Sequence, residues 1–292
     1  MASQLEESLL KEKLLEYLHE DVGFGDITTD SIIPSDIHAE AVIIQNNDGV
    51  IAGIRESTIL FQMAGVEVTE HINDGESSLK GRTIMKVRGL AKSILTVERT
   101  ALNLLMRMSG IATLTHEMVE EAHSVNPDLN VACTRKTTPG LRLFEKRAVS
   151  LGGGDTHRLR LDDAILIKSN HIAVVGAVDK AVKKARLDAS FTKKIEVEVT
   201  SVDQAIKAAK CGPDILMLDN MSPSEVTQVI SRLRELGLRD KLLVEVSGGV
   251  TRDTIKTYAK ADVNIVSLGL LTHSAKALDM NLKITKAWSS SE

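Results

Sequence analysis

Short apolar runs and helical patterns alternate over the C-terminal two thirds of the chain. The runs are rich in Ile, Val and Leu, and they have the length of buried strands. They lie at residues 130–134, 164–168, 195–200, 215–218, 242–246 and 264–268, with helical patterns at 174–187, 202–210, 222–236 and 251–259. This alternation predicts βαβ units and a parallel sheet. Because about six strands are visible, the pattern favours an open βα barrel over a complete eight-stranded one.

The first third of the chain has shorter elements. An amphipathic helical pattern over residues 1–18 precedes a second helix at 56–63. Strand-like runs lie at 39–45, 50–53, 66–72 and 83–87. These elements predict a small α+β unit.

A long helical pattern over residues 90–123 joins the two regions. Gly110 lies inside it, and because glycine weakens a helix interior we expect a break or bend there. The last residues, 288–292, are predicted to fray. Together the patterns predict an N-terminal α/β domain over residues 1–112 and a βα-barrel catalytic domain over 113–275. A C-terminal tail, about 276–292, could pack with the first domain.

Composition excludes several classes of function. Aromatic residues make up only 2% of the chain, which argues against the stacking platforms of single-strand binders. A net charge of −4 argues against a broad surface for a phosphate backbone. Nucleic acid is therefore not expected as a partner. A membrane is not expected either, because no run approaches the roughly 20 apolar residues that a membrane span requires. The two cysteines give no disulfide framework and no metal-ligand spacing, which favours a reducing, cytoplasmic location.

One segment departs from the acidic balance of the chain. Residues 134–171 carry eight Lys and Arg against four Asp and Glu, so that the rest of the chain has a net charge of −8. Turn residues interrupt these cations, which makes a single solvated helix face the weaker interpretation. Arg, Lys and His on irregular backbone suit a small ligand with several carboxylate or phosphate groups.

Polar residues follow nearly every predicted strand of the barrel. In βα barrels the carboxyl ends of the strands form the rim where ligands bind and react. The residues concerned are Thr134, Arg135, Lys136, Lys168, Glu198, Asp219, Asn220, Ser247, Gly248, Gly249 and Gly269. Their common register predicts a site at this rim.

Glu198 and Asp219 follow successive strands and suit Mg²⁺, which takes one or two carboxylates together with substrate phosphates. The alternative is a salt bridge to the rim lysines. The glycine turns at 247–249 and Gly269 precede helical patterns, as in phosphate-binding turns. A pair of glycines can also serve backbone geometry alone.

A nucleophile pair of Cys133 and His157 is the weaker hypothesis, because Cys133 lies inside an apolar run where cysteine is common as a small hydrophobic residue. The glycines at 152–154 lack the spacing of a dinucleotide fingerprint.

Three long motifs resemble the quinolinate phosphoribosyltransferase family. They are TRKTTPGLRLFEKRAV at 134–149, GGGDTHRLRL at 152–161 and LIKSNHI at 166–172. The resemblance extends to residues 20–30, 98–113, 196–199, 216–220, 244–249 and 267–275, nearly the whole chain. It implies an N-terminal α/β domain, an open barrel and an obligate homodimer in which the partner's N-terminal half completes each rim. Assembly of dimers into a hexamer stays open.

The resemblance also implies a reaction. Quinolinate and 5-phosphoribosyl 1-pyrophosphate, with Mg²⁺, give nicotinate mononucleotide, pyrophosphate and CO₂ in NAD biosynthesis. Arg135, Arg158 and Lys168 match binders of the quinolinate carboxylates, with Lys136 and His157 beside them. Arg99 matches an arginine donated across the dimer interface. Glu198 and Asp219 match acids facing the ribose and the metal, and Ser247, Gly248, Gly249 and Gly269 fall in the phosphate-binding turns. The residues assigned to catalysis are Lys136, Lys168, Glu198 and Asp219.

Two positions depart from the family pattern. Ser169 stands where an acid is usual, and Val246 stands where alanine is commoner.

Three other functions are alternatives for a chain with these motifs. A relative associated with molybdate-uptake genes shares the fold, but the intact residues 166–168 and 170–171 argue against it. Lys168 could instead form a Schiff base in a barrel lyase. A non-catalytic binding protein would not need the paired acids Glu198 and Asp219.

Overall fold

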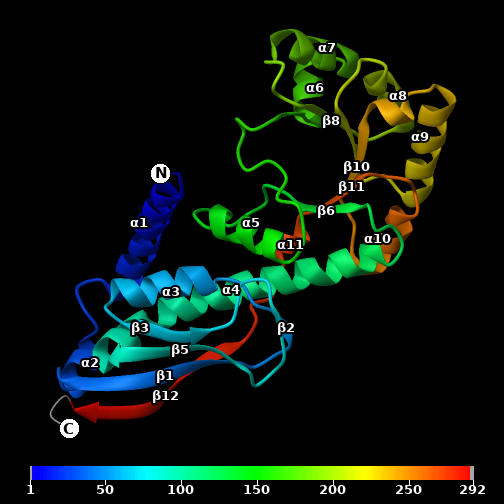
Figure 1. Ribbon diagram of the computed structural model, residues 1–292. Coiled ribbons are helices and arrows are strands. Elements are labelled where there is room, and N and C mark those ends of the chain that lie inside the picture. Colours follow the sequence, from blue (N-terminus) through cyan, green and yellow to red (C-terminus); the bar gives the residue numbers. More distant parts are fainter. Residues whose placement is uncertain (1, 290–292) are drawn as a thin grey trace. The chain divides into compact units, whose positions relative to one another are not determined.

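The structure is a computed structural model in which residues 2–289 are described, and it contains two compact units (Figure 1). The first unit comprises residues up to Thr113 together with the segment from Ala275 onward, and the second comprises Leu114–Ser274.

A four-stranded antiparallel sheet organises the first unit, in the order β12-β1-β5-β3. Its strands are β1 (Ile37–Gln45), β3 (Glu67–His71), β5 (Thr83–Leu90) and β12 (Met280–Ser289). Alternate residues of β1 are buried, as the period of two predicts for a sheet with one covered face. Helix α3 (Ile54–Met63) and the first part of α4 (Ala91–His123) lie over the sheet (Figure 1). The remaining elements are α1 (Ala2–Val22), α2 (Ile27–Ile32) and the short pair β2 (Gly49–Val50) and β4 (Ser77–Ser78).

Strand β12 corrects the prediction of a frayed C-terminus. It pairs with β1 through Ser289, and the ring of Trp288 stacks on His38 with 5.9 Å between centroids. Fraying is expected of residues 288–292 because the ends of a chain are often poorly ordered unless they are tied down. Pairing along the full length of β1 supplies the backbone hydrogen bonds that hold β12. Residues 290–292, also part of that prediction, lie outside the described residues.

A break or bend was predicted at Gly110, and the break is wrong because helix α4 is continuous through this position. A Cβ atom at this position would lie 2.0 Å from the carbonyl oxygen of Lys276. The glycine therefore lets the segment leading into β12 pass directly over the helix.

The second unit is built on a six-stranded parallel sheet, in the order β6-β11-β10-β9-β8-β7. Its strands are β6 (Asn130–Cys133), β7 (Ile165–Ile167), β8 (Ile195–Val199), β9 (Ile215–Asp219), β10 (Leu243–Ser247) and β11 (Ile265–Leu268). The edge strands β6 and β7 do not pair with each other, which confirms the predicted open barrel. Asp155 forms a parallel bridge with Ala132 of β6, so the segment that carries His157 and Arg158 runs along this free edge.

Helices connect the strands of this unit. They are α5 (Arg142–Leu151), α6 (Ser169–Val175), α7 (Val178–Asp188), α8 (Val202–Ala209), α9 (Pro223–Glu235), a 3₁₀ turn at Arg239–Lys241, α10 (Arg252–Ala259) and α11 (Leu270–His273). The single helix predicted over residues 174–187 is two helices. Gly176 adopts φ 92 and ends α6, because a left-handed residue cannot continue a helix.

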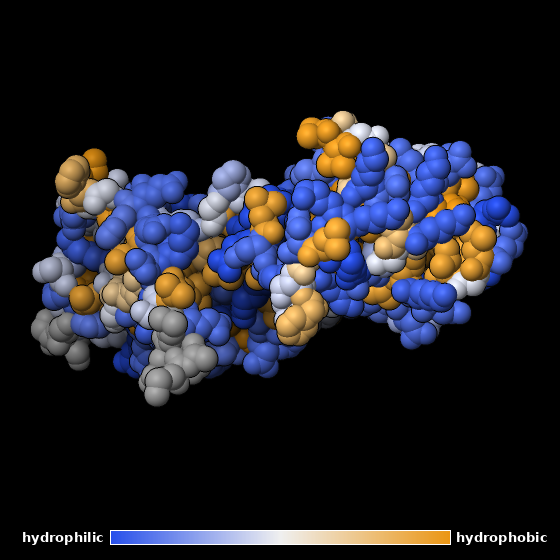
Figure 2. Space-filling model, turned by 90° about the horizontal axis from the view of Figure 1, so that it is seen from above, coloured by the Kyte–Doolittle hydropathy of each residue, from blue (hydrophilic) through white to orange (hydrophobic). Residues whose placement is uncertain are grey.

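The face of the molecule in Figure 2 is mainly hydrophilic, with hydrophobic residues in several small patches. Among the described residues, no helix has the length and apolar character that crossing a membrane requires.

Candidate active site

A cavity of about 280 Å³ opens at the carboxyl ends of the barrel strands. It brings together eight of the residues predicted from the sequence, namely Arg135, Lys136, His157, Arg158, Lys168, Glu198, Asp219 and Ser247. Its lining also includes Cys133, Thr134, Leu166, Met217, Glu245 and Ser267. We call this cavity the cup. Arg99 belongs to the other unit, where it is exposed on α4.

The strand register explains why the rim residues converge. Asp219 and Ser247 are direct partners at the ends of β9 and β10. Glu198, near the end of β8, lies beside Met217 of β9. Because parallel strands end at one edge of a sheet, their polar residues share one rim.

Two guanidinium groups, those of Arg135 and Arg158, line the cup. The Nε atom of Arg135 is buried and has no hydrogen-bond partner among the described residues. Burial and the neighbouring charge of Arg135 lower the pKa of Arg158, although arginine stays protonated in proteins. Buried donors are normally satisfied, so this pair favours an anionic ligand.

Lys168 and Glu198 form an ion pair with 2.5 Å between Nζ and Oε2. The backbone N–H of Ser169 donates to the other oxygen of Glu198 at 3.3 Å. Burial acts to raise the pKa of Glu198, but Lys168 lowers it overall. The salt bridge that the sequence left as an alternative is therefore present.

Asp219 has the opposite character. Burial raises its pKa, and the negative charge of Glu198 adds to the effect. The amide of Asn220 donates to Oδ2 of Asp219 at 2.9 Å. A divalent cation near both carboxylates would relieve their repulsion, and hard oxygen ligands suit Mg²⁺. The residues present fit this metal.

The turn at Ser247–Gly249 is shaped by its glycines. Gly248 and Gly249 have φ of 82 and 65, values that favour glycine. A Cβ on Gly248 would meet the side-chain oxygen of Asn220 at 2.4 Å. At the other turn, a Cβ on Gly269 would lie 3.0 Å from both Cδ of Lys136 and Nε2 of His273. Sequence reasoning did not single out His273, which follows Gly269 by one helical turn.

Cys133 is buried, its thiol lies 3.3 Å from the carbonyl oxygen of Thr156, and burial raises its pKa. A thiol held in its protonated form is a poor nucleophile, which supports its interpretation as a small hydrophobic residue.

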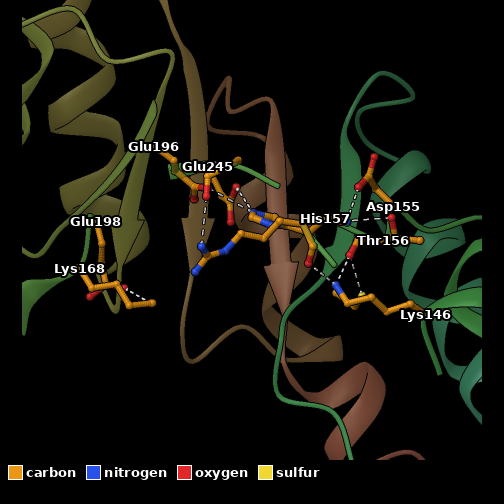
Figure 3. A network of polar contacts seen from close by, with 11 residues as sticks. Lys146, Asp155, Thr156, His157, Lys168, Glu196, Glu198 and Glu245 are labelled. Atoms are coloured by element: carbon orange, nitrogen blue, oxygen red, sulfur yellow. Dashed lines mark hydrogen bonds and ion pairs between the residues drawn. The ribbon is translucent and has the colours of Figure 1, made fainter. Parts of the chain in front are cut away.

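Sequence reasoning found His157 but missed two buried glutamates that face it, Glu196 and Glu245 (Figure 3). Each is a charged residue in the middle of an apolar strand, and that pattern was a signal available in the sequence. Lys146 of α5, also buried, was missed as well.

Comparisons with known proteins identify the family. Models described as the N-terminal and C-terminal domains of quinolinate phosphoribosyl transferase match residues 26–109 and 111–283. The chain is 51% identical over 261 residues to a probable nicotinate-nucleotide pyrophosphorylase (carboxylating) of Archaeoglobus fulgidus, covering 89% of this chain and 98% of the relative. A protein of the same name from Methanothermobacter thermautotrophicus is 46% identical over 269 residues, covering 92% and 96%. The structure of nicotinate-nucleotide pyrophosphorylase from Francisella tularensis matches with a TM-score of 0.87 at 35% identity, covering 95% of this chain and 96% of that one. The chain therefore belongs to the quinolinate phosphoribosyltransferase family.

Proposed function

We propose that the cup is where this quinolinate phosphoribosyltransferase carries out its reaction. As a member of the family, the enzyme converts quinolinate and 5-phosphoribosyl 1-pyrophosphate to nicotinate mononucleotide, pyrophosphate and CO₂ in NAD biosynthesis. The observation that carries the assignment to this cavity is the convergence of Arg135, Arg158 and Lys168 from three separate segments.

The cations hold the aromatic diacid. Arg135 and Arg158 bind its carboxylates, because a guanidinium can bind a carboxylate through two parallel hydrogen bonds. Lys168, at the opposite wall beside Glu198, adds a third positive charge. Fixing both carboxylates orients the pyridine nitrogen toward the anomeric carbon of the donor, and orientation of this kind lowers the barrier for bond formation.

The carboxylates act on the ribosyl group. As the bond from C1′ to the pyrophosphate oxygen breaks, its electron pair leaves with the pyrophosphate and positive charge develops on the ribosyl ring. Glu198 and Asp219 stabilise this charge, while the pyridine nitrogen donates the pair that forms the new bond to C1′. Lys136 balances charge on the departing pyrophosphate. When bound by Glu198 and Asp219, Mg²⁺ supplies further neutralisation of that charge.

Decarboxylation follows from the positive pyridinium. The bond from C2 to its carboxylate breaks, its electron pair stays on C2, and C2 takes up a proton as CO₂ departs.

The backbone turns at 247–249 and at Gly269 hold the 5′-phosphate of the donor, since their N–H groups precede α10 and α11.

The proposal includes a homodimer in which Arg99 of one protomer completes the cup of the other. Its support is the family resemblance and the exposure of Arg99 on α4.

The proposed location is the reducing cytoplasm. It is supported by the two free cysteines, Cys133 and Cys211.

The test is formation of nicotinate mononucleotide by the purified full chain with Mg²⁺. Quinolinate should be the acceptor, and nicotinate, which lacks one carboxylate, should be a poor one. Activity with nicotinate and none with quinolinate would contradict the proposal. Borohydride should trap no adduct on Lys168, whose ammonium forms an ion pair with Glu198; a trapped adduct would favour the lyase.

A further inference from the structure

Two glutamates at the cup have no role in the proposed reaction: Glu245 is part of its lining, and Glu196 is not. Glu196 comes from β8 and Glu245 from β10, the strands on either side of β9. Their side chains are 2% and 0% exposed. Burying a carboxylate is costly unless a charged or hydrogen-bonding group faces it. Yet Oε1 of Glu196 and both oxygens of Glu245 have no hydrogen-bond partner among the described residues.

His157 is the group that both glutamates face. Its Nε2 lies 3.5 Å from Oε2 of Glu196 and 3.4 Å from Oε2 of Glu245. Figure 3 shows the imidazole pointing toward the two carboxylates. Both distances exceed the roughly 2.7–2.9 Å of a tight charge-assisted hydrogen bond, so the ring is shared between the two carboxylates.

The two glutamates shift the pKa of His157. Burial acts to lower the pKa of His157, but the two glutamates raise it to about 10. The backbone N–H of Arg158 donates to Nδ1 of His157 at 2.8 Å, so the ring is held at both of its nitrogens.

The backbone around His157 needs such support. His157 has a φ of 51, a left-handed conformation that is unfavourable for a residue with a side chain. Its N–H donates to Oδ1 of Asp155 at 2.6 Å. Behind the turn, the ammonium of Lys146 donates to the carbonyl oxygens of Thr156 and, at 2.8 Å, Arg158 (Figure 3). The turn is thus held by Lys146 through its backbone and by the glutamates through the imidazole.

We propose that Glu196 and Glu245 are positioning residues for diacid recognition. Their carboxylates hold the ring of His157, and through the adjoining backbone they fix Arg158 where it can bind a carboxylate of a pyridine dicarboxylate. Neither glutamate is required to touch the phosphoribosyl donor. This inference rests on the proposed function of the cup.

The test uses the full chain with Glu196→Gln or Glu245→Gln, which remove the charge and keep the shape. The matched control is Glu56→Gln, because Glu56 is an equally buried carboxylate in the first unit. Calorimetry should show quinolinate binding weakened by about 10-fold or more in both barrel variants, the usual effect of losing a charged contact. The KM for the donor should stay within about 2-fold of the wild-type value, and Glu56→Gln should leave quinolinate binding unchanged.

A second readout follows His157 without catalysis. Diethyl pyrocarbonate modifies an accessible imidazole nitrogen, so a ring that the glutamates no longer hold should be modified at His157 faster in the glutamine variants than in wild type, as measured by mass spectrometry. The Glu196→Asp and Glu245→Asp variants keep the charge and should bind quinolinate better than the matching glutamine variants. If the glutamine variants do not fold, the aspartate variants take their place and should weaken quinolinate binding without raising the KM for the donor.

Equal losses for quinolinate and donor would overturn the inference, because they would show a merely structural role. Unchanged quinolinate binding with unchanged His157 reactivity would also overturn it. Failure of the proposed function has a different signature: wild type itself would not bind quinolinate, while the reactivity of His157 would still report whether the glutamates hold the ring.

Discussion

Lys168 and Glu198 join the ends of β7 and β8 through an ion pair of 2.5 Å at the rim of the barrel. Strand β7 has only three residues and lies at the free edge of the sheet, so few backbone hydrogen bonds fix its end. The ion pair therefore positions Lys168 within the cup and contributes to the stability of this edge.

Replacing Glu198 by Gln should destabilise the protein at neutral pH but not in acid. Burial acts to raise the pKa of Glu198, yet Lys168 lowers it below the ordinary value of 4.5. A carboxyl group of this kind stabilises the fold above its unfolded pKa, and the contribution is lost as pH falls through its folded pKa. Because Lys168 is about half exposed, we expect the ion pair to contribute only about 1 kcal/mol to the free energy of unfolding at pH 7. Thermal melts should show the gap between wild type and variant closing below about pH 4.5. The exposed pair of Arg232 and Glu235 supplies the control, since Glu235→Gln should show almost no gap. A gap that is the same at every pH would refute the linkage.

Replacing Asp219 by Asn should weaken Mg²⁺ dependence and slow turnover. The raised pKa of Asp219 reflects burial and the repulsion of Glu198, which a divalent cation would relieve. We expect the Mg²⁺ concentration for half-maximal activity to rise and kcat to fall by about 100-fold, with quinolinate binding little changed. Chelation should abolish activity of the wild-type enzyme. Asp253→Asn, at an exposed position of α10, is the control. An unaltered Mg²⁺ titration in the Asp219 variant would remove this residue from the metal site.

Replacing Arg135 or Arg158 by Ala should affect the two substrates unequally. Both side chains line the cup, and the buried Nε of Arg135 has no hydrogen-bond partner among the described residues, so the diacid supplies one in the proposed complex. Loss of a charge-assisted contact should weaken quinolinate by about 10–100-fold while the KM for the donor changes far less. Steady-state kinetics with each substrate varied in turn measures both effects, with Arg232→Ala as the surface control. Equal weakening of both substrates would contradict this division of roles.

The rim could be predicted from the sequence because parallel strands end at one edge. Once the apolar runs are located, the position of Lys168, Glu198, Asp219 and Ser247 follows from their register. The comparisons confirm the predicted family, and the topology confirms the open barrel. Short-range patterns suffice for these features.

Features that depend on contacts between distant segments could not be predicted in the same way. Glu196 and Glu245 are buried because each faces His157, which reaches them from the free edge beside β6. Strand β12 forms because β1 offers it a partner, although its own apolar signal is weak. The split at Gly176 depends on one left-handed residue that periodicity alone does not reveal.

Mixed dimers should test whether Arg99 acts in the partner's cup. Chains carrying Arg99→Ala and Lys168→Ala are each expected to be nearly inactive alone. After subunit exchange, a hybrid dimer contains one cup with an intact Lys168 from one chain and an intact Arg99 from the other. Random exchange should therefore restore about one quarter of wild-type activity, since half of the dimers are hybrids with one intact cup each. The control is each variant exchanged with itself. Proven exchange without recovery would place Arg99 in the cup of its own chain.

Replacing Gly110 by Ala distinguishes two explanations of the same glycine. If the residue were a tolerated weak point in α4, alanine would stabilise the protein by about 0.5–1 kcal/mol, because alanine favours helix. The close approach of Lys276 predicts the opposite, since a Cβ atom 2.0 Å from a carbonyl oxygen forces the backbone apart. We expect destabilisation by about 1–3 kcal/mol, as for overpacking at other buried sites, and a lower Tm. Asn103→Ala, at an exposed position of the same helix, controls for helix propensity and should leave the Tm unchanged or slightly higher. A Tm increase in the Gly110 variant would show that the segment entering β12 can move away from α4 at little cost.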